Sequence, residues 1–490
     1  MAIALLVLLL GGGAFAILRQ SPVSGCPSLL GRPVAKTTLA SRSFGAVATF
    51  SLPPPERWPN AITVASDDSV WFGEEAVPAL AHLYVTNGTL VEYSFPGTYP
   101  ANSTEGYDCA DKTDIWGVAL WDGRVWASDS AQNRLVGLSP ANDTFKVVSL
   151  AASDSQPYTL TPGPDNALWF TQIRSGQIGT LFANGTVVEH SIQISEHLND
   201  TSATVSVPGV PAQIVFANST TGYYVDASPL ISGPAVFAFD PEHFTPEPLG
   251  AGNQSLSDPD SISLGDGGIW LAQHGDSSIA FANAENGSLT VYPTSSVGYV
   301  GTTLPYFVET DGSLVWFNEH FGNRMAVLDF QNKTLTEYSL SDPAASNLSQ
   351  LDNALTFALG GGKAWFTEST ENSVGFVDSS YRPTFSISAS GNSTLSIQGG
   401  ESASLQVSLR GNSSSPIFIK FSGPGSAAPT ATNITMQADK NEVGSLVGSQ
   451  VINITVDVAP GTAAGRYTLL VTATDGLTSQ SAYLELSVPP

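Results

Sequence analysis

Carboxylate and carboxamide side chains recur at a fixed distance after an aromatic residue. The unit is an aromatic residue followed three positions later by an acid or amide, as in Trp316-Phe317-Asn318-Glu319. The acids and amides are Glu74, Asp129, Gln172, Asp226, Gln273, Glu319 and Glu368. If the repeats bring these groups to one mouth, a hard cation such as Mg²⁺ or Ca²⁺ would relieve their repulsion, with Glu319 and Glu368 as candidate ligands. Alternatively, a group repeated in every unit is structural and bonds backbone N–H groups of a neighbouring loop.

A second set of side chains precedes each unit, two positions before an aliphatic residue. These opening positions hold Asn60, Trp116, Tyr158, Ala212, Asp260, Tyr306 and Asn353. Aromatic and polar groups around a funnel suit a sugar or another flat polar ligand. The candidate ligand-binding residues are therefore Asn60, Trp116, Tyr158, Asp260, Tyr306 and Asn353. Packing of the rim is the alternative interpretation.

Two histidines directly follow repeat amides or acids on adjacent units, His274 after Gln273 and His320 after Glu319. Each is a candidate base or metal ligand, or else points away from the axis, because side chains alternate along a strand. With Glu368 and Tyr306 they complete the candidate catalytic residues. No Ser-His-Asp motif, Walker loop, dinucleotide fingerprint or Cys-His cluster occurs in the sequence.

The elements that position these groups follow from the repeat itself. The aromatic units begin at residues 71, 126, 169, 223, 270, 316 and 365, and each is preceded by a strand and a tight turn. Two further short strands follow in several repeats, and four strands in about 45 residues describe a blade of a β-propeller. We therefore predict an all-β protein with a seven-bladed propeller over residues 46–380. Residues 46–53 look like an orphan fourth strand that completes the last blade and closes the ring.

The repeat stops near residue 381, where the pattern of the sequence changes. Alternating runs at 403–409, 417–421, 451–458, 467–474 and 482–488 are separated by turns rich in Gly, Ser and Pro. They predict an immunoglobulin-like β-sandwich over residues 381–490. No cysteine occurs there, so the likeness to immunoglobulin domains is one of architecture.

The N-terminus carries an export signal. Residues 1–18 are apolar and contain Ala14-Phe15-Ala16, so they are a cleaved signal peptide or a retained membrane anchor. Residues 19–45 are expected to be a tail or linker. Outside the cell, Cys26 and Cys109 can form a disulfide. Two free thiols, or a lipidated Cys26, are the alternatives.

Composition limits the partners. The chain of 490 residues has 18 basic and 43 acidic residues, which argues against nucleic-acid binding. Fourteen of its asparagines begin an N-glycosylation sequon, an excess over chance that is typical of an exported glycoprotein. A turn composition rich in Ser and Thr is the alternative cause. The sequons begin at Asn87, Asn102, Asn142, Asn184, Asn199, Asn218, Asn253, Asn286, Asn332, Asn347, Asn392, Asn412, Asn433 and Asn453.

Three motifs carry a family resemblance over residues 46–380. Trp365-Phe366-Thr367-Glu368, Trp316-Phe317-Asn318-Glu319 and Pro59-Asn60-Ala61-Ile62 resemble the repeats of virginiamycin B lyase, the streptogramin lyase. The resemblance implies a magnesium-dependent lyase that opens a cyclic depsipeptide by elimination at its ester. The family's two histidine positions correspond here to Tyr306 and Asn353, whereas its glutamate is present as Glu368.

Together these observations predict an extracellular protein or one on the outer face of the cytoplasmic membrane. We expect a binding scaffold, a monomer or part of a surface assembly, that contacts the membrane only through its N-terminal segment. Its partner would be a glycan, a peptide or a surface protein. The alternative function is a metal-dependent lyase, breaking a C–O bond, or a hydrolase on the axial face.

Overall fold

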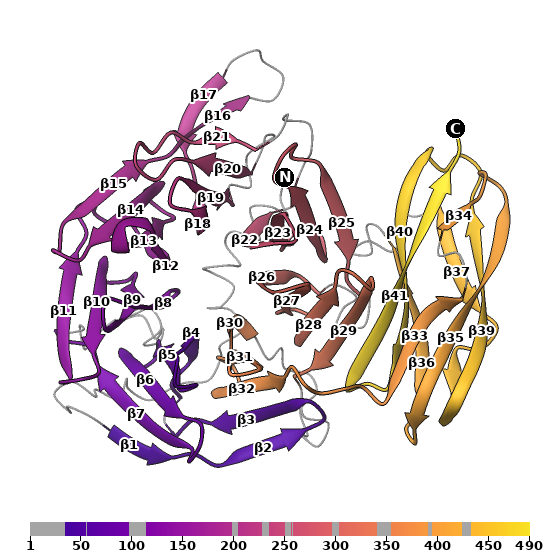
Figure 1. The fold of residues 1–490 in the computed structure, drawn as a ribbon, viewed down its shortest axis with the longest axis horizontal. Coiled ribbons are helices and arrows are strands. Elements are labelled where there is room, and N and C mark those ends of the chain that lie inside the picture. Colours follow the sequence, from indigo (N-terminus) through magenta and orange to yellow (C-terminus); the bar gives the residue numbers. More distant parts are fainter. Residues whose placement is uncertain are drawn as a thin grey trace, which may run out of the picture.

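The computed structural model describes residues 35–54, 56–97, 114–197, 204–227, 235–249, 256, 258–295, 303–340, 354–390, 394–423 and 433–490. These residues form β-strands joined by turns, with one short 3-10 turn at Pro164–Asn166 (Figure 1). The expected N-terminal segment and both cysteines lie outside this part of the chain. Among the described residues, no helix is long and apolar enough to cross a membrane.

Each aromatic unit lies on the second strand of an antiparallel sheet, and these sheets are arranged around a common centre (Figure 1). The first sheet contains β4 (Pro59–Val64), β5 (Val70–Glu74), β6 (Ala79–Tyr84) and β7 (Thr89–Ser94). The next contain β8 (Val118–Trp121), β9 (Arg124–Asp129), β10 (Arg134–Ser139) and β11 (Thr144–Ser149), then β12 (Pro157–Gly163), β13 (Ala167–Gln172), β14 (Gln177–Phe182) and β15 (Val187–Ser191).

The later sheets follow the same order. They contain β18 (Pro211–Asn218), β19 (Thr221–Asp226), β20 (Val236–Phe239) and β21 (Glu247–Pro248), then β22 (Pro259–Gly265), β23 (Gly268–Gln273), β24 (Ser278–Asn283) and β25 (Leu289–Pro293). After these come β26 (Pro305–Asp311), β27 (Leu314–Glu319), β28 (Arg324–Asp329) and β29 (Thr334–Ser339), and finally β30 (Ala354–Gly360), β31 (Lys363–Glu368) and β32 (Ser373–Asp378).

The last sheet receives its outer strand from the start of the described chain. Strand β3 (Val47–Ser51) pairs antiparallel with β32, from Val47 opposite Val377 to Ser51 opposite Ser373. Strand β2 (Ser41–Phe44) extends this sheet, and β1 (Ala35–Thr38) pairs with β7. These two strands correct the expectation that the whole of 19–45 is a tail or linker. Their short, polar sequences suit edge strands, which the repeat pattern does not reveal.

The motif aromatics supply the packing between neighbouring sheets. Trp126, Trp270 and Trp365 are fully buried. At the joint between the last and first sheets, Trp365 and Phe50 share one core cluster with Phe72. Burying such a side chain contributes roughly 2–3 kcal/mol. The aromatic unit is therefore explained by the interfaces between blades.

A hairpin not indicated by the repeat pattern lies between β15 and β18. Its strands are β16 (Gln193–His197) and β17 (Thr204–Pro208), and they pair only with each other in the described structure. This insertion accounts for the long spacing between the aromatic units at residues 169 and 223.

The C-terminal region forms two facing sheets around one apolar core. One sheet contains β33 (Phe385–Ser390), β35 (Ser402–Ser413), β37 (Ile434–Ala438) and β39 (Leu446–Val458). The other contains β34 (Thr394–Ser396), β36 (Ile417–Ser422), β38 (Glu442–Val443), β40 (Gly465–Thr474) and β41 (Thr478–Val488).

The second of these sheets continues directly into the propeller (Figure 1). Strand β41 pairs antiparallel with β29, from Thr334 opposite Ala482 to Tyr338 opposite Thr478. The hydroxyl of Tyr483 donates to the carbonyl of Pro293 at 2.9 Å. The two regions are therefore joined by backbone hydrogen bonds between strands and not only by a linker. A groove of about 810 Å³ lies beside this junction and is lined in part by Val291, Lys333 and Arg466.

Candidate functional site

In several blades the pairing between the first and second strands is irregular at the start of the first strand, and this redirects the side chains at the opening positions. The pairing register shifts after Pro157, Pro211, Pro259 and Pro305, at the beginning of β12, β18, β22 and β26. Proline lacks a backbone N–H and is tolerated at the first residue of a strand or at a bulge, and a bulge redirects the residues beside it. In each case the residue after the proline is an opening position, and Tyr158, Asp260 and Tyr306 are three of them.

Two of these tyrosines meet across the ring. Strands β12 and β26 lie on opposite sides of its centre (Figure 1), and the hydroxyl oxygens of Tyr158 and Tyr306 are 2.5 Å apart. The ring of Trp116 lies 5.2 Å from that of Tyr158 and 6.2 Å from that of Tyr306. Tyr158 is buried, whereas Trp116 and Tyr306 are partly exposed. Three opening positions therefore form one aromatic platform at the axis.

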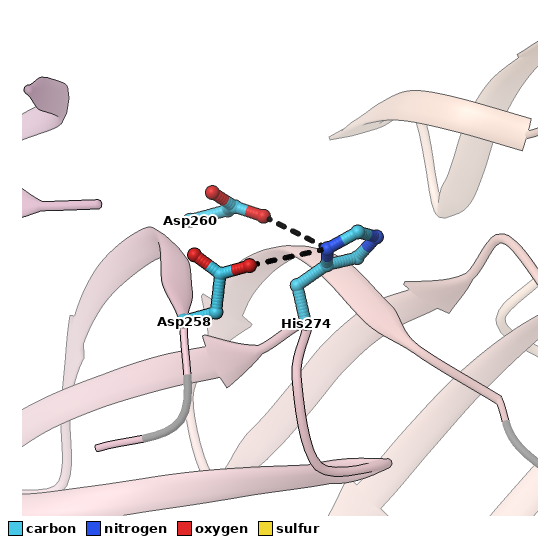
Figure 2. A group of neighbouring side chains, drawn as sticks. All are labelled: Asp258, Asp260 and His274. Carbon is cyan, nitrogen blue, oxygen red and sulfur yellow. Dashed lines mark ion pairs between the residues drawn. The ribbon is translucent and has the colours of Figure 1, made fainter. Parts of the chain in front are cut away.

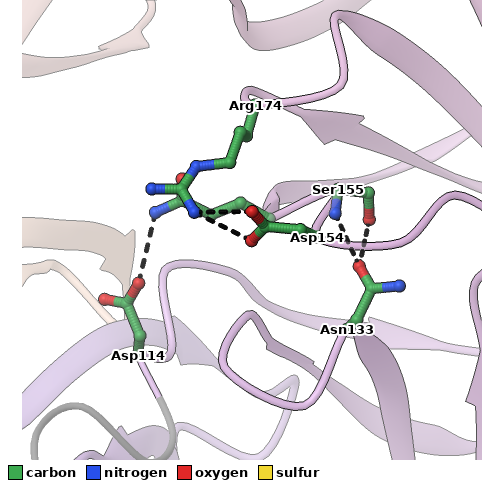
Figure 3. A network of polar contacts seen from close by, with 6 residues as sticks. Asp114, Asn133, Asp154, Ser155 and Arg174 are labelled. Atoms are coloured by element: carbon green, nitrogen blue, oxygen red, sulfur yellow. Dashed lines mark hydrogen bonds and ion pairs between the residues drawn. The ribbon is translucent and has the colours of Figure 1, made fainter.

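A polar network behind this platform fixes Trp116. Its indole nitrogen donates to Asp114 at 2.5 Å, and the amide nitrogen of Gln156 lies 3.4 Å from the other carboxylate oxygen. Nearby, the side-chain oxygen of Asn133 accepts from the backbone nitrogen of Ser155 at 2.8 Å (Figure 3). These contacts tie the turn after β9 to the connection that leads into β12.

Two carboxylates and an imidazole lie beside the platform (Figure 2). His274 follows β23, and its backbone nitrogen donates to the carbonyl of Asp258 at 3.0 Å. Its Nδ1 atom lies 3.5 Å from a carboxylate oxygen of Asp260 and 3.8 Å from one of Asp258. All three side chains are partly exposed. Among the described residues, this is the one group of three His, Cys, Asp or Glu side chains spaced so that it could hold a metal ion.

The second histidine completes the site. The Nε2 atoms of His274 and His320 are 2.8 Å apart, and both rings lie within 6 Å of the ring of Tyr306, at 5.2 and 5.7 Å. We call Trp116, Tyr158, Asp258, Asp260, His274, Tyr306 and His320 the axial cluster. It gathers side chains from four blades at one end of the ring.

Burial and neighbouring charges shift the pKa values of the ionisable groups in the axial cluster upward. Burial raises the pKa of Asp260 to about 7, although His274 opposes the shift. Burial alone would lower the pKa of His274, but the two aspartates outweigh it and the net shift is upward. Burial also raises the pKa of Tyr306, so its hydroxyl stays protonated at neutral pH. Asp260 and His274 therefore both hold a proton more strongly than the free side chains do.

The repeated acids and amides are not gathered at one mouth. Their partners lie within their own blades, on the third or fourth strand or the adjoining loop. Glu319 is buried against Glu337 and Arg324, and Glu368 accepts from Ser373 at 2.6 Å. Asp129 pairs with Arg134 at 2.7 Å. Neither Glu319 nor Glu368 belongs to the group around His274.

The other two candidate ligand-binding residues, Asn60 and Asn353, do not belong to the axial cluster. Asn60 is buried and donates to Glu75 at 2.9 Å, within its own blade. Asn353 lies outside the described residues. Sequence reasoning missed Asp258 and Asp114. The sequence does contain a signal for Asp258. It lies two residues before Asp260, and residues two apart on an extended chain face the same side.

The described sequons of the propeller lie at the other end of the sheets. They occupy turns between the first and second or the third and fourth strands, at Asn87, Asn142, Asn184, Asn218, Asn286 and Asn332. The axial cluster lies where inner strands begin and second strands end. The sequons at 102, 199, 253, 347 and 392 lie outside the described residues.

Comparisons with known proteins identify the fold. No family profile matches the chain, and no curated protein does. A solved streptogramin B lyase matches 67% of this chain and 96% of its own, with 20% identity and a TM-score of 0.52. Virginiamycin B lyase from Staphylococcus aureus matches with 67% and 98% coverage, 18% identity and a TM-score of 0.53. The catalytically inactive variant of that lyase, solved with quinupristin, matches 67% of this chain and 98% of its own, with 17% identity and a TM-score of 0.52. This chain therefore shares the propeller fold of those lyases, and a shared fold does not by itself transfer an activity.

Proposed function

We propose that this protein is an exported, cell-surface propeller that binds a flat polar ligand, such as a glycan, on its axial cluster. The proposal includes a seven-bladed ring closed by β3, an immunoglobulin-like C-terminal sandwich, and an N-terminal signal or anchor. The single observation that carries it is the convergence of Trp116, Tyr158, Asp260, His274 and Tyr306 from four blades. Binding sites commonly combine an apolar surface with a few convergent polar groups.

The chemistry of the cluster suits a sugar ring or a comparable planar group. Aromatic faces stack on such ligands, while Asp260 and His274 offer hydrogen-bond acceptors and donors beside them. Glycans on the described sequons of the propeller would not cover this end, because those turns lie at the opposite end of the blades. The acidic net charge favours neutral or cationic ligands.

The test is a glycan and peptide array probed with the wild-type ectodomain and two variants. We expect Trp116→Ala to lose at least about tenfold in affinity for the best binder, because truncating an aromatic hot-spot residue costs about 2 kcal/mol or more. Arg466→Ala in the junction groove is the matched control and should bind like the wild type. Loss of binding with Arg466→Ala but not with Trp116→Ala would place the site at the junction and refute the proposal.

A second candidate, metal-assisted elimination or hydrolysis, is favoured by the contact between His274 and His320 next to Tyr306. A neutral imidazole at that position can take a proton, and the Tyr306 hydroxyl can donate one. Incubation with quinupristin, followed by mass spectrometry, tests this function directly. Turnover that His320→Gln abolishes would support it, whereas an unchanged depsipeptide would argue against a lyase of that specificity.

A further inference from the structure

We propose that Asp258, Asp260 and His274 bind one divalent first-row transition-metal ion, such as Zn²⁺. The inference goes beyond the proposed function, because a metal here requires no organic ligand on the aromatic platform. It also differs from the cation site expected from the sequence, since it uses neither Glu319 nor Glu368. Its three donors are one imidazole nitrogen and two carboxylate oxygens.

The distances between donors favour a metal over direct hydrogen bonds. His274 Nδ1 lies 3.5 Å from Asp260 and 3.8 Å from Asp258, beyond the 2.7–3.2 Å of an N–H···O bond. Ligands about 2.1 Å from zinc stand about 3.0–3.4 Å apart in octahedral or tetrahedral geometry. The three donor atoms lie within 4.8 Å of one another, and the two distances from His274 need to contract by only a few tenths of an ångström to reach that spacing.

The backbone holds these donors in position. Asp258 and Asp260 flank Pro259 at the start of β22, where the pairing register shifts between Pro259 and Ser261. His274 stands opposite them, since its backbone nitrogen bonds the carbonyl of Asp258. One blade thus supplies all three donors, from the start of β22 and the end of β23.

His320 supplies the outer contact that a metal-binding histidine requires. With Nδ1 of His274 directed at the metal, Nε2 carries the proton and can donate to Nε2 of His320 at 2.8 Å. Such outer contacts fix the tautomer of the ligand, and their loss typically weakens metal affinity about 10–100-fold. The arrangement is therefore a ligand set with its orienting partner, which a chance group of acids does not provide.

The donor set also selects the metal. An imidazole nitrogen favours zinc and other first-row transition ions, whereas Mg²⁺ and Ca²⁺ prefer sites built from oxygen. Three protein ligands leave at least one position open toward the solvent, as in catalytic zinc sites. We expect Zn²⁺ and Co²⁺ to bind with one-to-one stoichiometry and more tightly than Ca²⁺ or Mg²⁺.

The experiment is a calorimetric titration of the chelator-treated ectodomain with ZnCl₂, supported by the visible spectrum of bound Co²⁺. His274→Gln and Asp260→Asn should each lose at least about tenfold in affinity, and His320→Gln about 10–100-fold. The matched control is His243→Gln, since His243 forms an exposed pair with Asp240 at 3.0 Å on the surface. It should bind zinc like the wild type.

The outcomes separate this inference from the proposed function. Zinc affinity that survives both His274→Gln and Asp260→Asn, or that is lost in His243→Gln, would overturn it. If His274→Gln fails to fold, as judged by thermal melting, Asp258→Asn provides the same test from the other strand. Ligand binding on the array in the presence of chelator would leave the proposed function standing even if no zinc bound.

Discussion

Replacing Glu368 by glutamine should stabilise the protein at alkaline pH and leave it unchanged in acid. Glu368 is 2% exposed, and its carboxyl group accepts a hydrogen bond from the hydroxyl of Ser373 at 2.6 Å. Burial raises its pKa from 4.5 to about 7, a shift that Ser373 opposes. The side chain therefore prefers to be a neutral acid in the folded protein.

This pKa shift sets the sign and the size of the expected change in the free energy of unfolding. Between pH 4.5 and 7 the folded protein keeps a proton that the unfolded chain releases, so the free energy of unfolding falls as the pH rises. Above pH 7 the penalty levels off at about 3 kcal/mol, from about 1.36 kcal/mol for each pKa unit. Glutamine carries no charge and can still accept from Ser373, so Glu368→Gln should recover up to about 3 kcal/mol at pH 8.

Urea unfolding at pH 4.5 and pH 8 measures this effect. The control is Glu247→Gln, an exposed acid on strand β21 of another blade, which should shift neither midpoint. The reasoning is refuted if Glu368→Gln is less stable than the wild type at pH 8. That result would mean that the carboxylate is charged and held by a cation, as the sequence alone suggested.

Three further outcomes follow from other contacts. Arg57→Met should cost about 3–5 kcal/mol in urea unfolding, because it strips the buried carboxylate of Glu92 of an ion pair at 2.5 Å. Tyr483→Phe should cost about 1 kcal/mol in the same assay, by removing the bond to Pro293 that helps to join the sandwich to the propeller. Expression in a glycosylating secretory host should give Asn286→Gln an intact mass lower by one glycan, and an equal mass would show that this sequon is unused.

Much of the fold was accessible from sequence because packing imposes a period. A buried Trp or Tyr residue recurs on the second strand of each described blade, so that strand carries a visible signal. Residues 46–53 have the alternation of an outer strand but belong to no repeat of their own, which indicated that they complete the last blade. Strand β3 does pair with β32. Edge strands such as β1 and β2 carry no such signal, since exposed positions tolerate many residues.

The candidate site was only partly accessible. The opening positions were found from their offset to an aliphatic residue, and the structure brings Trp116, Tyr158 and Tyr306 together. Counting along the repeat could not decide between a cation site and a structural role for the repeated carboxylates, because it specifies the end of a strand but not which side the last side chain faces. The ladder between β29 and β41 was also missed, since pairing between domains leaves no local pattern.

The central claim is that the axial cluster is the binding face, and the histidines offer a direct test. The chain has six, of which only His274 and His320 belong to the cluster. Protein labelled with ¹⁵N only at histidine should therefore show two ring signals that shift when the best binder from the array is added. Shifts confined to the other histidines, or none at saturating ligand, would contradict the claim.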